Sequence, residues 1–169
     1  MMPPPYLALS LVYWLHMLAT VAWIGSLVAL SILVLPAARK ALEPSAYADL
    51  VACLRRRLDP LSWLSLLVLT ATGMFQMSAN PNYQGFLSFG NRWAVAILIK
   101  HLLFLGMVGV SAYLSWGLIP RLQRVAILQA RDQSAPQAQS WARREALLLR
   151  LNLLLSLLVL AFTALARAS

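Results

Sequence analysis

Four long apolar stretches constrain this chain more than any other feature of its sequence. A membrane helix needs about 20 apolar residues, because it rises about 1.5 Å per residue through a hydrocarbon core of roughly 30 Å. The stretches that meet this need are residues 7–36, 61–79, 93–118 and 147–166. The first lacks a basic segment before it and is too long for a signal peptide, so we expect it to be retained. We predict an all-α protein, a single integral membrane domain of residues 1–169 folded as a four-helix bundle.

The composition agrees with a membrane protein and excludes other classes. Hydrophobic residues make up 61% of the chain and charged residues 11%, with a mean hydropathy of +0.73. A water-soluble fold has roughly a quarter charged residues, so this chain lacks the polar groups to cover a surface in water. The same numbers exclude disorder, a secreted disulfide scaffold and a soluble nucleic-acid binder. Cys53 is the only cysteine, which excludes an internal disulfide and a cysteine-based metal cluster.

Basic residues gather in two of the segments that connect the spans. The net charge of +9 comes from 14 Lys and Arg against 5 Asp and Glu. These segments carry Arg39, Lys40, Arg55, Arg56 and Arg57 in residues 37–60, and Arg121, Arg124, Arg131, Arg143 and Arg144 in residues 119–146. The positive-inside rule places both segments in the cytoplasm, with both termini outside. We expect these arginines to meet anionic lipid headgroups.

The two basic segments also carry helix signals of their own. Ser45 and the residues after it, with Pro44 just before, read as a short amphipathic helix. Residues 121–131 can extend the third span beyond the membrane surface, and residues 132–136 then break the helix. Ser140 is suited to cap a helix that continues into the fourth span.

The membrane interior contains few groups that can carry chemistry. No Asp or Glu lies inside a predicted span, which removes carboxylate proton relays and paired-carboxylate hydrolysis. The two histidines of the chain lie at similar depths. His16 is nine residues from Leu7, or about 13 Å, and His101 is eight residues from Trp93, or about 12 Å. Thr72 falls at about the same level, in the outer half of the bilayer, where an ionisable residue is a functional candidate by default.

Two imidazoles that face each other across a bundle are suited to axial ligation of a haem iron. Small residues at Ala19, Thr20, Gly106 and Gly109 would then give the macrocycle room. The alternative is that each histidine bonds a neighbouring Thr, Ser or carbonyl group. Lys100 could hold a propionate or an anionic substrate, or extend its stem to the outer interface.

Methionines near the end of the second span suggest a different ligand. Met74 and Met77 stand three residues apart, close to Gln76. Thioether and imidazole groups suit Cu(I), although methionine at helical spacing is also common in simple packing. His16 and His101 are therefore candidates for a haem or copper centre, with Thr72, Gln76 and Lys100 as supporting or substrate-side groups.

The residues around the first histidine resemble the first helix of the CopD-like copper-resistance membrane domain. In that family an aromatic-Leu-His opening, here residues 14–16, leads to a Trp-hydrophobic-Gly turn, here residues 23–25. Residues 70–76, 93–121 and 150–153 look like its second, third and last helices. The resemblance implies a four-helix membrane bundle with a role in copper handling across the inner membrane.

A related four-helix family, the HemJ-type protoporphyrinogen oxidases, also has a histidine in its first helix and binds haem b. In that family a Leu-Pro-Arg stretch leads to a second histidine. Here Leu35-Pro36 continues into Ala37-Ala38-Arg39, and no histidine follows. The resemblance therefore supports haem at His16 and His101 without implying the oxidase activity.

Three functions follow from these observations. The first is an inner-membrane copper transport or resistance protein that takes the metal at His16, His101, Met74 and Met77. The second is a redox protein or oxidase in which a bis-histidine haem b, with Lys100 beside it, passes electrons. The third is a cofactor-free structural subunit that assembles with other membrane subunits.

Overall fold

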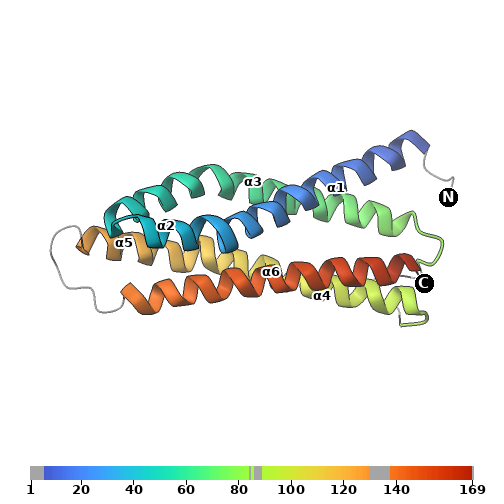
Figure 1. The fold of residues 1–169 in the computed structure, drawn as a ribbon. Coiled ribbons are helices and arrows are strands. Elements are labelled where there is room, and N and C mark those ends of the chain that lie inside the picture. Colours follow the sequence, from blue (N-terminus) through green and yellow to red (C-terminus); the bar gives the residue numbers. More distant parts are fainter. Residues whose placement is uncertain (1–5, 84, 86–88, 130–137, 169) are drawn as a thin grey trace.

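The computed structural model describes residues 6–83, 85, 89–129 and 138–168, which form four long helical rods (Figure 1). The first rod joins α1 (Tyr6–Val28), the π-helical turn η1 (Ala29–Val34) and α2 (Leu35–Ala41). The second is α3 (Pro44–Ser78). The third joins α4 (Arg92–Ala112), the π-helical turn η2 (Tyr113–Leu118) and α5 (Ile119–Gln129). The fourth is α6 (Ala138–Ala168).

All four rods are long and apolar enough to cross a membrane, which confirms the predicted all-α fold and its four spans. The candidate spans are Tyr6–Ala41, Ser45–Ser78, Arg92–Val125 and Gln139–Ala168. Each has 30 to 36 residues, whereas a bilayer core needs only about 20. The helices therefore continue past the hydrocarbon core into the connecting regions.

These extensions change the predicted account of the connecting segments. The short helix expected at Ser45 is the beginning of α3, which continues through Pro60 without ending. The expected extension of the third span is present up to Gln129, while Arg131 and the break at residues 132–136 lie outside the described residues. The predicted cap at Ser140 is wrong, because this residue lies inside α6, which begins at Ala138.

The rods pack through one main apolar core. α1 packs chiefly against α3, and α4 against α6, while α1 also contacts α6 and α3 contacts α5. The core takes buried side chains from every rod, among them Trp23, Leu66, Met107, Leu118 and Leu149. Other large apolar side chains point outward, as a lipid-facing surface requires.

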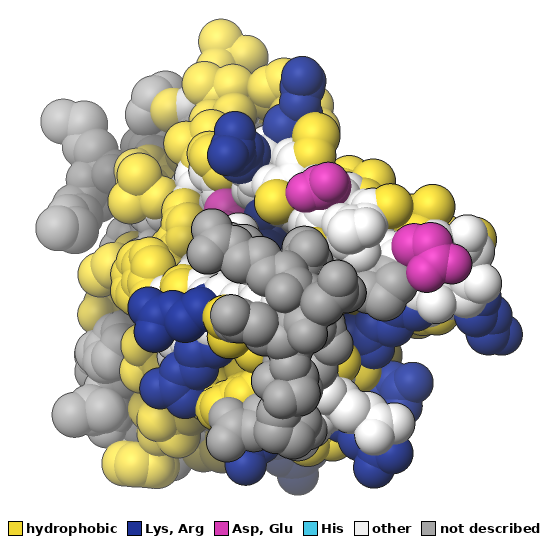
Figure 2. Space-filling view, turned by 90° about the vertical axis from the view of Figure 1, so that its left-hand side faces the viewer, with side chains coloured by type: hydrophobic (Ala, Val, Ile, Leu, Met, Phe, Trp, Pro, Cys, Tyr) yellow, Lys and Arg dark blue, Asp and Glu magenta, His cyan; other side chains and the backbone are white. Residues whose placement is uncertain are grey.

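The two ends of the bundle differ in charge. Both chain ends and the α3–α4 connection lie at one end, which we call the terminal end (Figure 1). The α2–α3 connection, the end of α5 and the beginning of α6 lie at the other, which we call the basic end. Figure 2 views the basic end, where Lys and Arg side chains surround the helix tips. The charge asymmetry predicted from the sequence is therefore present in the fold.

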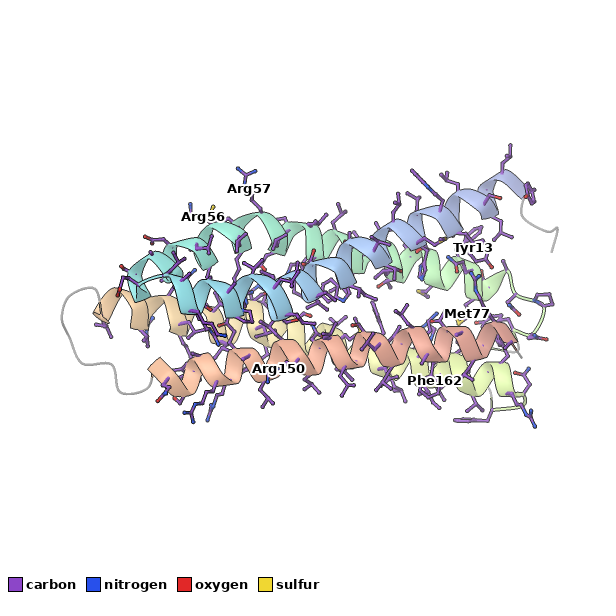
Figure 3. All side chains as sticks on the ribbon, viewed as in Figure 1. Tyr13, Arg56, Arg57, Met77, Arg150 and Phe162 are labelled. Atoms are coloured by element: carbon purple, nitrogen blue, oxygen red, sulfur yellow. The ribbon has the colours of Figure 1, made fainter. Side chains whose placement is uncertain are left out.

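A buried ion cluster joins three rods near the basic end. The Glu145 side chain of α6 is almost fully buried, with 2% of its surface exposed. Its two oxygens lie 2.9 Å from Arg39 Nη2 of α2 and 3.4 Å from Arg55 Nη2 of α3. These two arginines therefore bind a carboxylate inside the protein. Arg56 and Arg57, by contrast, are exposed and point away from the bundle (Figure 3).

Candidate functional site

The first histidine lies between α1 and α3 and is fixed by a threonine. His16 Nδ1 is 2.7 Å from Thr72 Oγ1, so the two residues share a level in the bundle as predicted. The Thr72 hydroxyl also donates to the Val68 carbonyl one helical turn earlier. Because a hydroxyl has a single proton, Thr72 must accept from His16 Nδ1–H. We assign the neutral tautomer whose lone pair is on Nε2.

Gly73, the next residue of α3, faces the histidine ring without crowding it. A Cβ atom placed on Gly73 would lie 3.6 Å from His16 Cε1, which is ordinary van der Waals contact. The ring is half-buried, while Thr72 is buried with 8% of its surface exposed. α3 therefore fixes both the orientation and the tautomer of His16.

The second histidine is bonded within its own helix. His101 Nδ1 lies 2.7 Å from the Ile97 carbonyl oxygen of α4. A carbonyl only accepts, so Nδ1 carries the proton and the lone pair is on Nε2. The alternative interpretation of the sequence, in which each histidine bonds a Thr, Ser or carbonyl group, predicts both of these Nδ1 bonds. They are also the bonds with which metal-binding histidines commonly fix their tautomer.

A pocket of about 240 Å³ lies at the terminal end and takes lining residues from all four rods. Lys100 and Gln76, two of the predicted supporting groups, line it, and so do Tyr13, Met77 and Arg167. Figure 3 shows Tyr13 and Met77 at this end of the bundle. Arg167 was not among the site residues predicted from the sequence. The fold places its guanidinium 5.3 Å from the centre of the Tyr13 ring.

The two candidate methionines have different surroundings. Met77 is 6% exposed, packs with Trp93 and Ala166, and lines the pocket. Met74, three residues earlier, is 53% exposed on the surface of α3. Helical spacing alone could not predict which methionine is buried, because it does not show which side of α3 packs against the neighbouring rods. The structure therefore joins Met77, and not Met74, to the pocket.

The small residues expected to accommodate a haem differ in burial. Ala19 is buried in α1, whereas Gly106 and Gly109 are exposed on α4. None of them lines the pocket beside Lys100, which is smaller than the roughly 300–1,000 Å³ typical of sites for drug-sized ligands. Bis-histidine haem binding stays a prediction.

A metal site built only from His, Cys, Asp or Glu side chains is not found among the described residues. In the described ranges, no group of three or more His, Cys, Asp or Glu side chains is placed to hold a metal ion. Imidazole and thioether groups remain as candidate donors, and these are the ligands that Cu(I) accepts.

A polar contact in the middle of the bundle was missed by the sequence argument. Asn152 of α6 is 1% exposed and donates from Nδ2 to Ser111 Oγ of α4 at 2.9 Å. Ser111 in turn donates to the Met107 carbonyl. An Asn among leucines in a predicted span was the available signal, because such a side chain needs an interhelical partner in lipid.

The fold and these groups define an integral membrane protein, a four-helix bundle with two oriented imidazoles. Residues 52–166 match the family described as copper resistance protein D, or CopD, which covers more than half of the chain. The chain belongs to this family and is a copper-resistance membrane protein. The match includes Thr72, Met77, Lys100 and His101, while His16 precedes it. No curated protein and no solved structure matches the chain.

Proposed function

We propose that the protein binds Cu(I) as its substrate in the half of the bundle near the terminal end, with His16 as the principal ligand. The observation that carries the proposal is the 2.7 Å bond from His16 Nδ1 to Thr72. This bond fixes the ring and leaves the lone pair on Nε2, as a metal ligand requires. In a copper-resistance membrane protein, such a ring gives a soft cation a defined site within an apolar bundle.

The proposed ligand set adds a thioether and a second imidazole. Met77 is the buried methionine at the pocket, and His101 carries its lone pair on Nε2 in the same half of the bundle. Cu(I) accepts imidazole nitrogen and thioether sulfur. Met74 lies outside this set because its side chain faces outward.

We also propose that both termini are outside a bacterial cytoplasmic membrane, so that the terminal end faces outward. The positive-inside rule supports this orientation, because the Lys and Arg side chains surround the basic end (Figure 2). Copper that arrives from outside would then meet His16 in the outer half of the bilayer.

The test is Cu(I) affinity of the detergent-purified protein, measured by competition with a chromophoric Cu(I) chelator under a reductant. His16→Ala should weaken binding by at least 10-fold. Thr72→Val keeps the shape of the side chain but removes the acceptor, and should weaken binding by about 10-fold or more. Circular dichroism and size-exclusion elution would establish that each variant is folded.

Two methionine variants provide a matched comparison three residues apart. Met77→Leu should weaken Cu(I) binding, whereas Met74→Leu should leave it unchanged. Wild-type affinity in folded His16→Ala would overturn the proposed site. A wild-type protein that binds no Cu(I) would overturn copper binding altogether and leave the structural-subunit function to be tested by co-purification.

A further inference from the structure

The pocket at the terminal end brings two cations together without an acid. Lys100 of α4 and Arg167 of α6 both line it, and its lining residues include no Asp or Glu. Within the part of the chain that the structure describes, neither cation forms a salt bridge. The acidic residues in that part are Glu43, Asp49, Asp59 and Glu145, all on the half of the bundle toward the basic end.

This arrangement is unlike the way the same protein treats its other buried charge. Glu145 is matched by Arg39 and Arg55, both within 3.4 Å. Taking a charge out of water is unfavourable unless an opposite charge and hydrogen bonds compensate for it. Lys100 is partly buried in the pocket with a second cation on the same wall. Among its described lining residues, the pocket therefore has no negative charge to match these cations.

The pocket also offers a neutral hydrogen-bond donor, and its arginine is held in place by an aromatic ring. The Gln76 side-chain nitrogen Nε2 is buried and has no hydrogen-bond partner among the described residues. The Arg167 guanidinium packs over the Tyr13 ring at 5.3 Å, which holds this long side chain at the rim of the pocket. The residues that carry these donors thus line one pocket from α3, α4 and α6.

We propose that this pocket binds a phosphate group between the Lys100 ammonium and the Arg167 guanidinium, with the Gln76 amide as a third donor. A guanidinium matches two phosphate oxygens at once, and an ammonium supplies a compact charge. Donors from three separate helices suit a tetrahedral oxyanion better than a planar carboxylate. The phosphate group can belong to a phospholipid of the surrounding leaflet or to free phosphate at the membrane surface.

The experiment measures thermal unfolding of the full chain in a neutral maltoside detergent and a phosphate-free, copper-free buffer. Ligands are inorganic phosphate, phosphatidylglycerol, and a diacylglycerol with the same chains but no phosphate. At about 100-fold excess over Kd, a bound ligand should raise Tm by about 5 °C. Lys100→Met and Arg167→Gln should each weaken the response by about 10-fold in ligand concentration.

The matched control is Arg150→Gln, which removes another exposed arginine of α6 that does not line the pocket. This variant should respond as the wild-type protein does. Stabilisation by inorganic phosphate would identify a free-anion site, and stabilisation by phosphatidylglycerol alone would identify a lipid site. The proposal is overturned if neither ligand raises Tm, if diacylglycerol does so equally, or if Arg167→Gln responds like Arg150→Gln. Because copper is absent, these outcomes do not depend on the proposed copper site.

Discussion

The two ends of the bundle handle charge in opposite ways. Near the basic end, a buried carboxylate at Glu145 has two arginines within 3.4 Å, and three rods meet at that cluster. At the terminal end, Lys100 and Arg167 line one pocket without an acidic residue. Ion pairing in the first case holds helices together, which is a structural role. The unmatched cations in the second case suit the phosphate group that we propose for this pocket.

The largest expected effect concerns which end faces the cytoplasm. Cys53 is the only cysteine of the chain and is exposed on α3, beside the arginines. If the basic end is cytoplasmic, a membrane-impermeant maleimide should not label Cys53 in intact cells and should label it fully after permeabilisation. The labelled fraction, read by gel shift, decides the orientation.

The control for this labelling uses the terminal end. A Cys53→Ala, Ser78→Cys variant moves the thiol to an exposed position at the end of α3. It should label in intact cells without permeabilisation. The reverse pattern in the two proteins would place both termini inside and would contradict the positive-inside assignment.

The next largest effect should come from removal of the buried carboxylate. Glu145→Ala leaves Arg39 and Arg55 without their shared partner, and loss of one member of a buried pair typically costs about 3–5 kcal/mol. We expect a fall of this order in the free energy of unfolding, measured by denaturant titration in detergent. Asp59→Ala is the control, because the Asp59 side chain is 36% exposed and its Oδ1 lies 3.6 Å from Arg55 Nη1, which is a longer and more solvated ion pair. That change should cost less than about 1 kcal/mol, and equal losses in the two variants would refute a structural role for Glu145.

A smaller effect would make the terminal end resemble the basic end. Gln76→Glu introduces a carboxylate of nearly the same shape into the pocket that Lys100 and Arg167 line. We expect it to stabilise the protein by about 1.5 kcal/mol, at the lower end of the range for a hydrogen bond to a charged group. The Tm increase with phosphate should disappear in the same variant. Gln76→Leu is the control, because it removes the donor without adding charge. Equal Tm increases with phosphate in Gln76→Glu and Gln76→Leu would contradict the proposal that this pocket binds an anion.

The sequence predicts the depth of a residue in the bundle, but it does not predict which helices pack together. Helix rise and span boundaries place His16 and Thr72 at one depth, and the 2.7 Å bond between them confirms that count. The cluster at Glu145 joins residues about 90 to 106 positions apart, so it depends on which rods pack together. Met74 and Met77 show the same limit, since equal chemistry and close spacing led to opposite burial.

The smallest expected effect lies between the two ends, where neutral groups replace charges. Asn152 Nδ2 donates to Ser111 Oγ at 2.9 Å and so joins α6 to α4 through a side-chain hydrogen bond. Such interhelical bonds in membrane proteins average about 0.6 kcal/mol. Ser111→Ala should therefore lower the free energy of unfolding by roughly that amount, far less than Glu145→Ala. Thr163→Ala is the control, because the Thr163 hydroxyl bonds the Val159 carbonyl of its own helix. A loss in Ser111→Ala as large as that in Glu145→Ala would mean that the Asn152–Ser111 bond stabilises the packing of the rods as strongly as the buried ion cluster does.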